Sequence, residues 1–170
     1  GRDADTGGQT LYVLELAQAL SCHPDVAKVD LITRLVVDES VSDDYQLPIE
    51  QLSDNLRIVR IEAGPERYIA KEQLWDYLDG FADNLARFFS ENDSFPVLLH
   101  SHYADAGLVG THLANLFAIP LIHTGHSLGR VKRSRLLARG LATDEIEHGY
   151  NISRRIEAEE LTLATAERVI

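Results

Sequence analysis

A chain of 170 residues is long enough for one domain with a hydrophobic core, and its composition, 45% hydrophobic and 25% charged, is that of a globular protein. Its formal net charge of −11 argues against a general nucleic-acid binder, and no apolar run approaches the roughly 18 residues of a membrane-spanning helix. The single cysteine, Cys22, excludes an internal disulfide framework and favours a cytoplasmic location. Because the chain lacks methionine, we expect it to be a piece of a longer protein.

The first half of the chain alternates predicted helices and strands. Residues 11–20 are rich in helix formers and predict a mostly buried helix, with Gly7 and Gly8 at its N-terminus. A strand is predicted at 29–33 and a half-exposed strand at 56–61, where apolar residues alternate. The acidic, polar residues 38–55 predict a surface excursion between them. Apolar residues at helical spacing over 71–89 then predict an amphipathic helix.

The second half repeats the alternation. Residues 97–103 begin as a buried strand and end in polar rings, and a helix is predicted from about 108 to 117. A short buried strand at 119–122 follows, Thr143 is the expected N-cap of a further helix, and residues 167–170 read as the start of a strand. The order predicts an α/β fold: a Rossmann-like parallel sheet with helices on both faces.

Polar side chains gather where predicted elements end, at residues 7–9, 102–105 and 126–127. The carboxyl ends of parallel strands are where ligands bind in such sheets, so we expect these segments to lie along one edge. A cluster of five basic residues follows, and it favours a small anion as ligand; a solvated helix face is the alternative. The cluster consists of Arg130, Lys132, Arg133, Arg135 and Arg139.

Several kinds of site fit the sequence poorly. Ser127 lies in no Gly-x-Ser-x-Gly elbow, and the glycines form no Gly-x-Gly-x-x-Gly signature. The paired histidines lack the cysteine or aspartate partners of a zinc site, so no metal site is expected. Each histidine is expected to be hydrogen-bonded at a strand end, with His126 as the exception. The four histidines considered are His100, His102, His123 and His126.

Four segments, in the same order and at matching separations, resemble the sucrose-phosphate synthases of glycosyltransferase family 4. They are residues 3–9 (DADTGGQ), 102–107 (HYADAG), 124–130 (TGHSLGR) and 154–160 (RRIEAEE). The resemblance implies that residues 1–170 are a partial N-terminal, acceptor-binding domain of a GT-B enzyme, without its nucleotide-sugar domain. Such enzymes transfer glucose, with retention and without a metal, from UDP-glucose or ADP-glucose to fructose 6-phosphate. Neither a nucleic acid nor a membrane is an expected partner.

The resemblance also implies roles for individual residues. His126 matches the catalytic histidine that faces the transferred glucose. Lys132 and Arg155 match a clamp on the 6-phosphate, and a phosphate dianion indeed favours two cations. The remaining expected acceptor contacts are Gly7, Gly8, Gln9, Lys71, Tyr103 and Ser127.

Three alternatives stay open at this point. A sucrose synthase uses unphosphorylated fructose and has no need of Lys132 and Arg155, whereas a mannosylfructose-phosphate synthase differs in its donor. A non-catalytic sugar-phosphate-binding module is the third alternative. We expect this chain alone to lack transferase activity under each of them, because the donor site lies on the absent domain.

Overall fold

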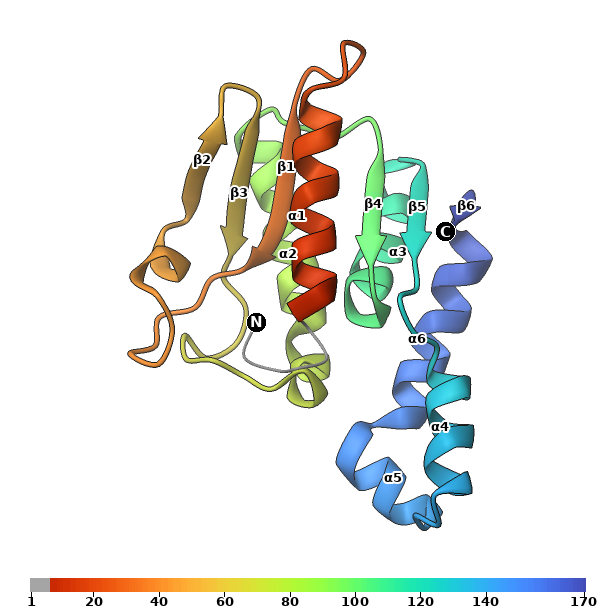
Figure 1. Cartoon of the computed structure of the whole chain (residues 1–170). Coiled ribbons are helices and arrows are strands. Elements are labelled where there is room, and N and C mark those ends of the chain that lie inside the picture. Colours follow the sequence, from red (N-terminus) through yellow and green to blue (C-terminus); the bar gives the residue numbers. More distant parts are fainter. Residues whose placement is uncertain (1–6) are drawn as a thin grey trace. The chain divides into compact units, whose positions relative to one another are not determined.

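The computed structural model describes residues 7–170 as two compact units, residues 7–68 and residues 69–170 (Figure 1). Residues 3–6 of the first motif lie outside the described residues. Within the described part of the chain, every helix is too short or too polar to cross a membrane.

The first unit is a three-stranded sheet with one long helix. In the order β1-β3-β2, β1 pairs parallel with β3 from Val29 opposite Leu56, and β2 pairs antiparallel with β3. An ion pair between Asp30 and Arg57 joins β1 to β3, with Arg57 Nε 2.8 Å from Asp30 Oδ1. The elements are α1 (Gly7–Ser21), β1 (Val29–Arg34), the 3-10 turn η1 (Asp43–Gln46), β2 (Ile49–Ser53) and β3 (Leu56–Ile61).

Three predictions for this unit are wrong. The strand at 56–61 is not half-exposed, because four of the six residues of β3 are buried and none is exposed. Residues 38–55 are not merely a surface excursion, because they contain β2; its residues are mostly exposed and polar, so it is held by backbone pairing that no hydrophobic pattern announces. Helix α1 is not mostly buried: Leu11 is 56% exposed, whereas Ala17 is 6% exposed. The helix is apolar on several faces, but only one face is needed to pack against β1 and β3.

The second unit holds a three-stranded parallel sheet in the order β4-β5-β6. Leu99 lies opposite Leu121 and Ile122 opposite Arg168, so the strand predicted at 167–170 is confirmed. Helix α3 packs against β4, β5, α2 and α6. The elements are η2 (Lys71–Tyr77), α2 (Leu78–Glu91), β4 (Leu99–His102), α3 (Ala104–Phe117), β5 (Leu121–Thr124), α4 (Gly129–Ala138), α5 (Thr143–Tyr150), α6 (Ile152–Thr165) and β6 (Arg168–Val169).

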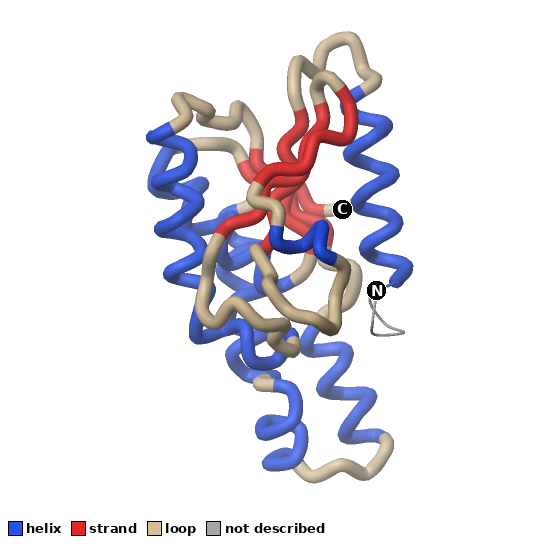
Figure 2. Tube along the Cα trace, turned by 90° about the vertical axis from the view of Figure 1, so that its left-hand side faces the viewer, coloured by secondary structure: helices blue, strands red, loops and turns tan. Residues whose placement is uncertain are grey.

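Helices α4 and α5 extend past the carboxyl ends of β4 and β5 (Figures 1 and 2). A small core of its own holds this region: Leu136, Ile146 and Ile152, from α4, α5 and α6, are all buried against one another. Between α5 and α6, Asn151 has a φ of +45°, a left-handed conformation that asparagine tolerates, and this breaks the helix. The structure therefore places α4 and α5 beyond the end of the sheet where ligands are expected.

Several element boundaries differ from the prediction: α3 begins at Ala104 and not near residue 108, and β5 covers Leu121–Thr124 and not 119–122. The helix predicted at 71–89 begins as the 3-10 segment η2, whose Trp75 is buried, and becomes α-helical at Leu78. Helix α5 has Ala142, not Thr143, at its N-cap, and the side chain of Glu145 accepts the Ala142 N–H at 2.9 Å. The carboxylate in the first turn thus satisfies the backbone N–H of the N-cap residue itself.

Candidate functional site

The site begins where β4 and β5 end. His102 lies opposite Thr124 in the parallel register, and each strand is followed by a polar segment that leads into a helix. Tyr103 precedes α3, and Ser127 precedes α4. These two residues therefore follow the same end of one sheet, as predicted. Gly7 belongs to the first unit, and its place on the same edge stays a prediction.

The backbone is strained at both strand ends. Tyr103 has a φ of +77° and His126 a φ of +54°, in the region that residues with a Cβ seldom adopt. The N–H of Ser127 donates to the carbonyl of Gly125 at 2.6 Å and closes a tight turn around His126. Such conformations cost about 1–3 kcal/mol each and persist only where surrounding contacts hold them.

A row of histidine rings supports the turn. His102 Nδ1 lies 3.0 Å from His126 Nε2, within hydrogen-bond distance. The ring centres of His100 and His102 are 4.2 Å apart, and His100 Nε2 lies 2.8 Å from the hydroxyl of Thr124. The prediction that His100, His102 and His123 are hydrogen-bonded is confirmed, whereas His126, the expected exception, is hydrogen-bonded too.

Burial lowers the pKa of the histidines in this row. The pKa of His102 falls to about 4, first because of burial and then because of the neighbouring rings of His100, His126 and His123. Burial is also the main cause that lowers the pKa of His100 and of His126. The rings are therefore neutral at pH 7, so that one can donate and the other accept in the His102–His126 hydrogen bond.

We expect the protein to lose stability as the pH falls from 6.5 towards 4. In that window the unfolded chain, in which His102 has its ordinary pKa of 6.5, binds a proton that the folded chain, with a pKa of about 4, does not. Urea unfolding measured at several pH values tests this. His102→Asn should flatten the dependence, whereas His148→Asn, at an exposed position of α5, should leave it unchanged. If the free energy of unfolding depends on pH equally in both variants, His102 is not the group responsible for the loss of stability.

Arg155 on α6 brings three of the predicted residues together. Its side chain is buried, and its Nη2 donates to the carbonyl of Ser127 at 2.8 Å and lies 3.0 Å from the Ser127 hydroxyl. The guanidinium carbon lies 4.5 Å from the centre of the Tyr103 ring. Arg155, Ser127 and Tyr103 are thus confirmed as neighbours, at the carboxyl ends of the strands.

Glu159 is a member of this cluster to which the sequence analysis gave no role. Its Oε1 accepts from Arg155 Nε at 2.8 Å, and its Oε2 accepts from the backbone N–H of Gly129 at 2.7 Å, the first residue of α4. Both side chains of the ion pair are buried. The spacing of Arg155 and Glu159, four residues apart on one helix, is the signal that would have predicted the pair.

Gly129 has no room for a side chain. A Cβ there would lie 2.9 Å from Ile156 Cγ1 and 3.2 Å from Glu159 Oε2. The absence of a Cβ lets α6 approach the N-terminus of α4 closely enough for the carboxylate to reach a free amide. A negative charge at that position is also favoured by the helix dipole.

Lys71 and Lys132 are the other two predicted cations, and they lie on η2 and α4. Burial raises the pKa of Asp105 in the first turn of α3, and the charges of Arg155 and Lys71 act in the opposite direction. Lys71 at the start of η2 therefore lies within electrostatic range of Asp105. Lys132 lies on α4, which packs against α6, and its ammonium is 4.1 Å from the centre of the Tyr150 ring.

The glycine loop belongs to the first unit. Helix α1 begins at Gly7, so Gly7, Gly8 and Gln9 form its first turn, as predicted. The amides of a first helical turn have no partner within the helix and can bind an anion.

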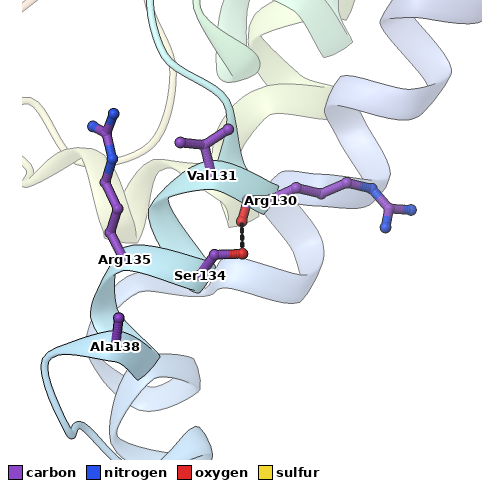
Figure 3. A pocket seen from close by; sticks show the side chains of 5 residues that line it. All are labelled: Arg130, Val131, Ser134, Arg135 and Ala138. Atoms are coloured by element: carbon purple, nitrogen blue, oxygen red, sulfur yellow. Dashed lines mark hydrogen bonds between the residues drawn. The ribbon is translucent and has the colours of Figure 1, made fainter.

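A shallow hollow lies on the outer surface of α4 (Figure 3). The residues that line it all come from this helix, and the hydroxyl of Ser134 donates to the carbonyl of Arg130 at 3.0 Å. The side chains of Arg130 and Arg135 point away from each other. The hollow includes none of the predicted contact residues. Among residues 7–170, no three histidine, cysteine or acidic side chains are placed to hold a metal ion.

Comparisons with known proteins agree on one family. A model described as "Glycosyl transferase 4-like domain" matches residues 7–170. The chain is 44% identical to a probable sucrose-phosphate synthase from Solanum tuberosum and 43% identical to sucrose-phosphate synthase 4 from Arabidopsis thaliana. Both alignments cover 100% of this chain, but 19% and 18% of the relatives. The chain thus spans about a fifth of their length.

A solved structure has the same fold. A sucrose-phosphate synthase from Thermosynechococcus elongatus superposes with a TM-score of 0.74 at 29% identity, over 96% of this chain and 36% of that chain. A second structure of that synthase gives a TM-score of 0.66 at 25% identity, over 94% of this chain and 70% of that one. The likeness confirms the predicted fold class, a Rossmann-like α/β arrangement.

Proposed function

Because the chain belongs to the glycosyl transferase 4-like domain family, we propose that it is the acceptor-binding domain of a sucrose-phosphate synthase. The intact protein transfers glucose from UDP-glucose or ADP-glucose to fructose 6-phosphate, with retention, and produces sucrose 6-phosphate in the cytoplasm. The identity to named synthases over the whole chain supports this proposal. The observation that carries it is the cluster of Arg155, Ser127 and Tyr103 at the carboxyl ends of β4 and β5.

In this proposal the cluster binds the acceptor. The bonds to Glu159 and Ser127 engage Nε and Nη2 of Arg155 and leave its second amino group, Nη1, for the phosphate. Lys132 and Lys71 add two further cations from α4 and η2. The hydroxyls of Ser127 and Tyr103 bind the sugar, and the first turn of α1 at residues 7–9 stays a predicted acceptor contact. A phosphate dianion in such a site makes charge-assisted hydrogen bonds, which are about twice as strong as neutral ones.

The chemistry of the transfer is assigned to His126 and to the donor. As the nucleotide leaves, positive charge develops at the anomeric carbon, and correct orientation of the glucose lowers the barrier. A neutral imidazole at His126, held in its tight turn, is suited to orient the sugar without repelling that charge. The nucleotide is held by a second domain of the intact protein, no metal takes part, and this chain alone is inactive.

Loss of either cation of the clamp should weaken the binding of fructose 6-phosphate much more than the binding of fructose. A charge-assisted hydrogen bond contributes about 1.5–3 kcal/mol, so Lys132→Ala or Arg155→Ala should weaken the binding of fructose 6-phosphate roughly ten- to over a hundredfold. Fructose never made that contact, and its weak binding should barely change. Calorimetric titration of both sugars at one ionic strength measures the difference, with Arg133→Ala on the exposed side of α4 as the control.

The same titrations separate a sucrose synthase from the proposed enzyme, and turnover of different nucleotide sugars separates a mannosylfructose-phosphate synthase. A sucrose synthase would bind fructose as well as its phosphate, and both alanine variants would then leave the ratio of the two affinities unchanged. A mannosylfructose-phosphate synthase would discriminate as proposed, but would turn over a different nucleotide sugar. If the phosphate is preferred by the wild type and by both variants alike, the clamp lies elsewhere and the acceptor assignment fails.

A further inference from the structure

The ion pair of Arg155 and Glu159 has an unusual arrangement for a site that binds an anion. Both side chains are nearly inaccessible, with relative exposures of 4% and 5%. A buried carboxylate directly beside the arginine offsets the positive charge that a phosphate needs. A site that only binds an anion would bind it more tightly through an arginine without such a partner. The position of the carboxylate beside Arg155 therefore needs an explanation.

The hydrogen bonds of Glu159 give a geometric explanation for the carboxylate beside Arg155. One oxygen holds Arg155 Nε at 2.8 Å and the other holds the amide of Gly129 at 2.7 Å, so the carboxylate joins α6 to the first residue of α4. Because Nε is fixed, the planar guanidinium has one orientation. In that orientation Nη2 meets the carbonyl of Ser127 at 2.8 Å. Glu159 thereby determines where the remaining amino group points.

The charge of Glu159 gives an electrostatic explanation for its position beside Arg155. The negative charge of Glu159 reaches beyond Arg155: it acts on His123, where it opposes the lowering of the pKa by burial, and on Tyr103. Two unit charges a few ångströms apart interact strongly in a partly buried site. Free phosphate gains only from net positive charge, whereas a sugar phosphate also gains from the aligned hydroxyls of Ser127 and Tyr103.

We propose that Glu159 is a positioning residue that fixes Arg155 and lowers the affinity of the site for free phosphate, so that the acceptor site selects a sugar phosphate. This inference rests on the proposed function. Glu159 touches neither substrate in this arrangement, and its effect passes through Arg155 and through the start of α4. Sugar phosphates and free phosphate share the same dianion, so selection between them requires that charge alone is not sufficient for binding.

The adjacent residue offers a matched control. Glu160 also pairs with an arginine, and Arg130 Nε donates to its Oε1 at 2.8 Å. That pair is solvent-exposed, with side-chain exposures of 75% for Arg130 and 50% for Glu160. Glu159→Gln and Glu160→Gln therefore remove the same charge from neighbouring positions of one helix. Exposed pairs are screened by water and contribute little, so only the first change should alter the acceptor site.

The experiment uses the full-length protein with fructose 6-phosphate as acceptor and inorganic phosphate as inhibitor. In Glu159→Gln we expect phosphate to inhibit about tenfold more tightly, because a unit of opposing charge is lost, while kcat/KM for fructose 6-phosphate falls about tenfold. If Glu159 had only a structural role, Glu159→Gln would weaken the binding of fructose 6-phosphate and of inorganic phosphate together. Glu160→Gln should differ from the wild type by less than about twofold in each quantity.

A second variant keeps the inference testable if Glu159→Gln does not fold. Glu159→Asp retains the charge but is one methylene shorter, so it cannot hold Arg155 and Gly129 at once. We expect a similar fall in kcat/KM with no tighter inhibition by phosphate. Phosphate inhibition in Glu159→Gln equal to that in Glu160→Gln, or a wild-type kcat/KM in Glu159→Asp, would overturn the inference. A wild-type protein that does not bind fructose 6-phosphate would instead refute the proposed function.

Discussion

His126→Ala in the intact protein should lower kcat about a hundredfold while the KM for fructose 6-phosphate changes little. The reason is that His126 is assigned to the transferred glucose, and misplacement of reacting groups by about 1 Å already costs about 10²-fold. In the proposed function the acceptor's phosphate is bound by other residues, above all Arg155, so we expect its binding to be unaffected by the loss of the ring. Steady-state kinetics with both substrates varied measures the two parameters separately.

Two variants complete this test. His112→Ala removes an exposed histidine of α3, whose Nδ1 lies 3.9 Å from Asp79, and should have wild-type kinetics. His102→Ala removes the partner that lies 3.0 Å from His126 Nε2, and should lower kcat by a smaller factor. A normal kcat in His126→Ala would exclude this residue from the site. A raised acceptor KM at normal kcat would place the ring against fructose 6-phosphate instead.

Arg155→Met should lower the free energy of unfolding of the second unit by about 3–5 kcal/mol. The substitution leaves the buried carboxylate of Glu159 without its counter-charge, and breaking one half of a buried ion pair is strongly destabilising. Urea unfolding followed by fluorescence measures the change. Trp75 is the single tryptophan of the 170 residues, lies in the same unit and is 6% exposed, so its emission reports the unfolding of this unit.

The double variant Arg155→Met with Glu159→Gln should recover a large part of this loss. No charge remains buried, the methionine fills the space of the arginine stem, and the amide oxygen of glutamine can still accept from Gly129. Arg130→Met is the control, because its partner Glu160 is exposed and the pair contributes at most about 1 kcal/mol. If the double variant is less stable than Arg155→Met, the pair is not the cause of the loss.

The elements of the second unit were largely predictable. The apolar runs before His102 and Thr124 gave β4 and β5, and the position of polar residues directly after them placed Tyr103 and Ser127 at one end of the sheet. Both inferences depend on the order of residues along the chain and on the rule that ligands bind at the carboxyl ends of parallel strands. The strand β2 was missed because it is held by backbone hydrogen bonds to β3, which leave no pattern in its own side chains.

The sequence by itself determined the fold class and the family, and it placed Tyr103 and Ser127 after neighbouring strands, because strand and helix periodicity and four motifs are properties of the chain order. Only the tertiary structure decided how those residues are bonded. Arg155 and Ser127 are 28 residues apart, and the pairing of Glu159 with Gly129 spans 30. Contacts of this kind depend on how closely α6 approaches α4, and that distance is decided by packing and by the missing side chain of Gly129.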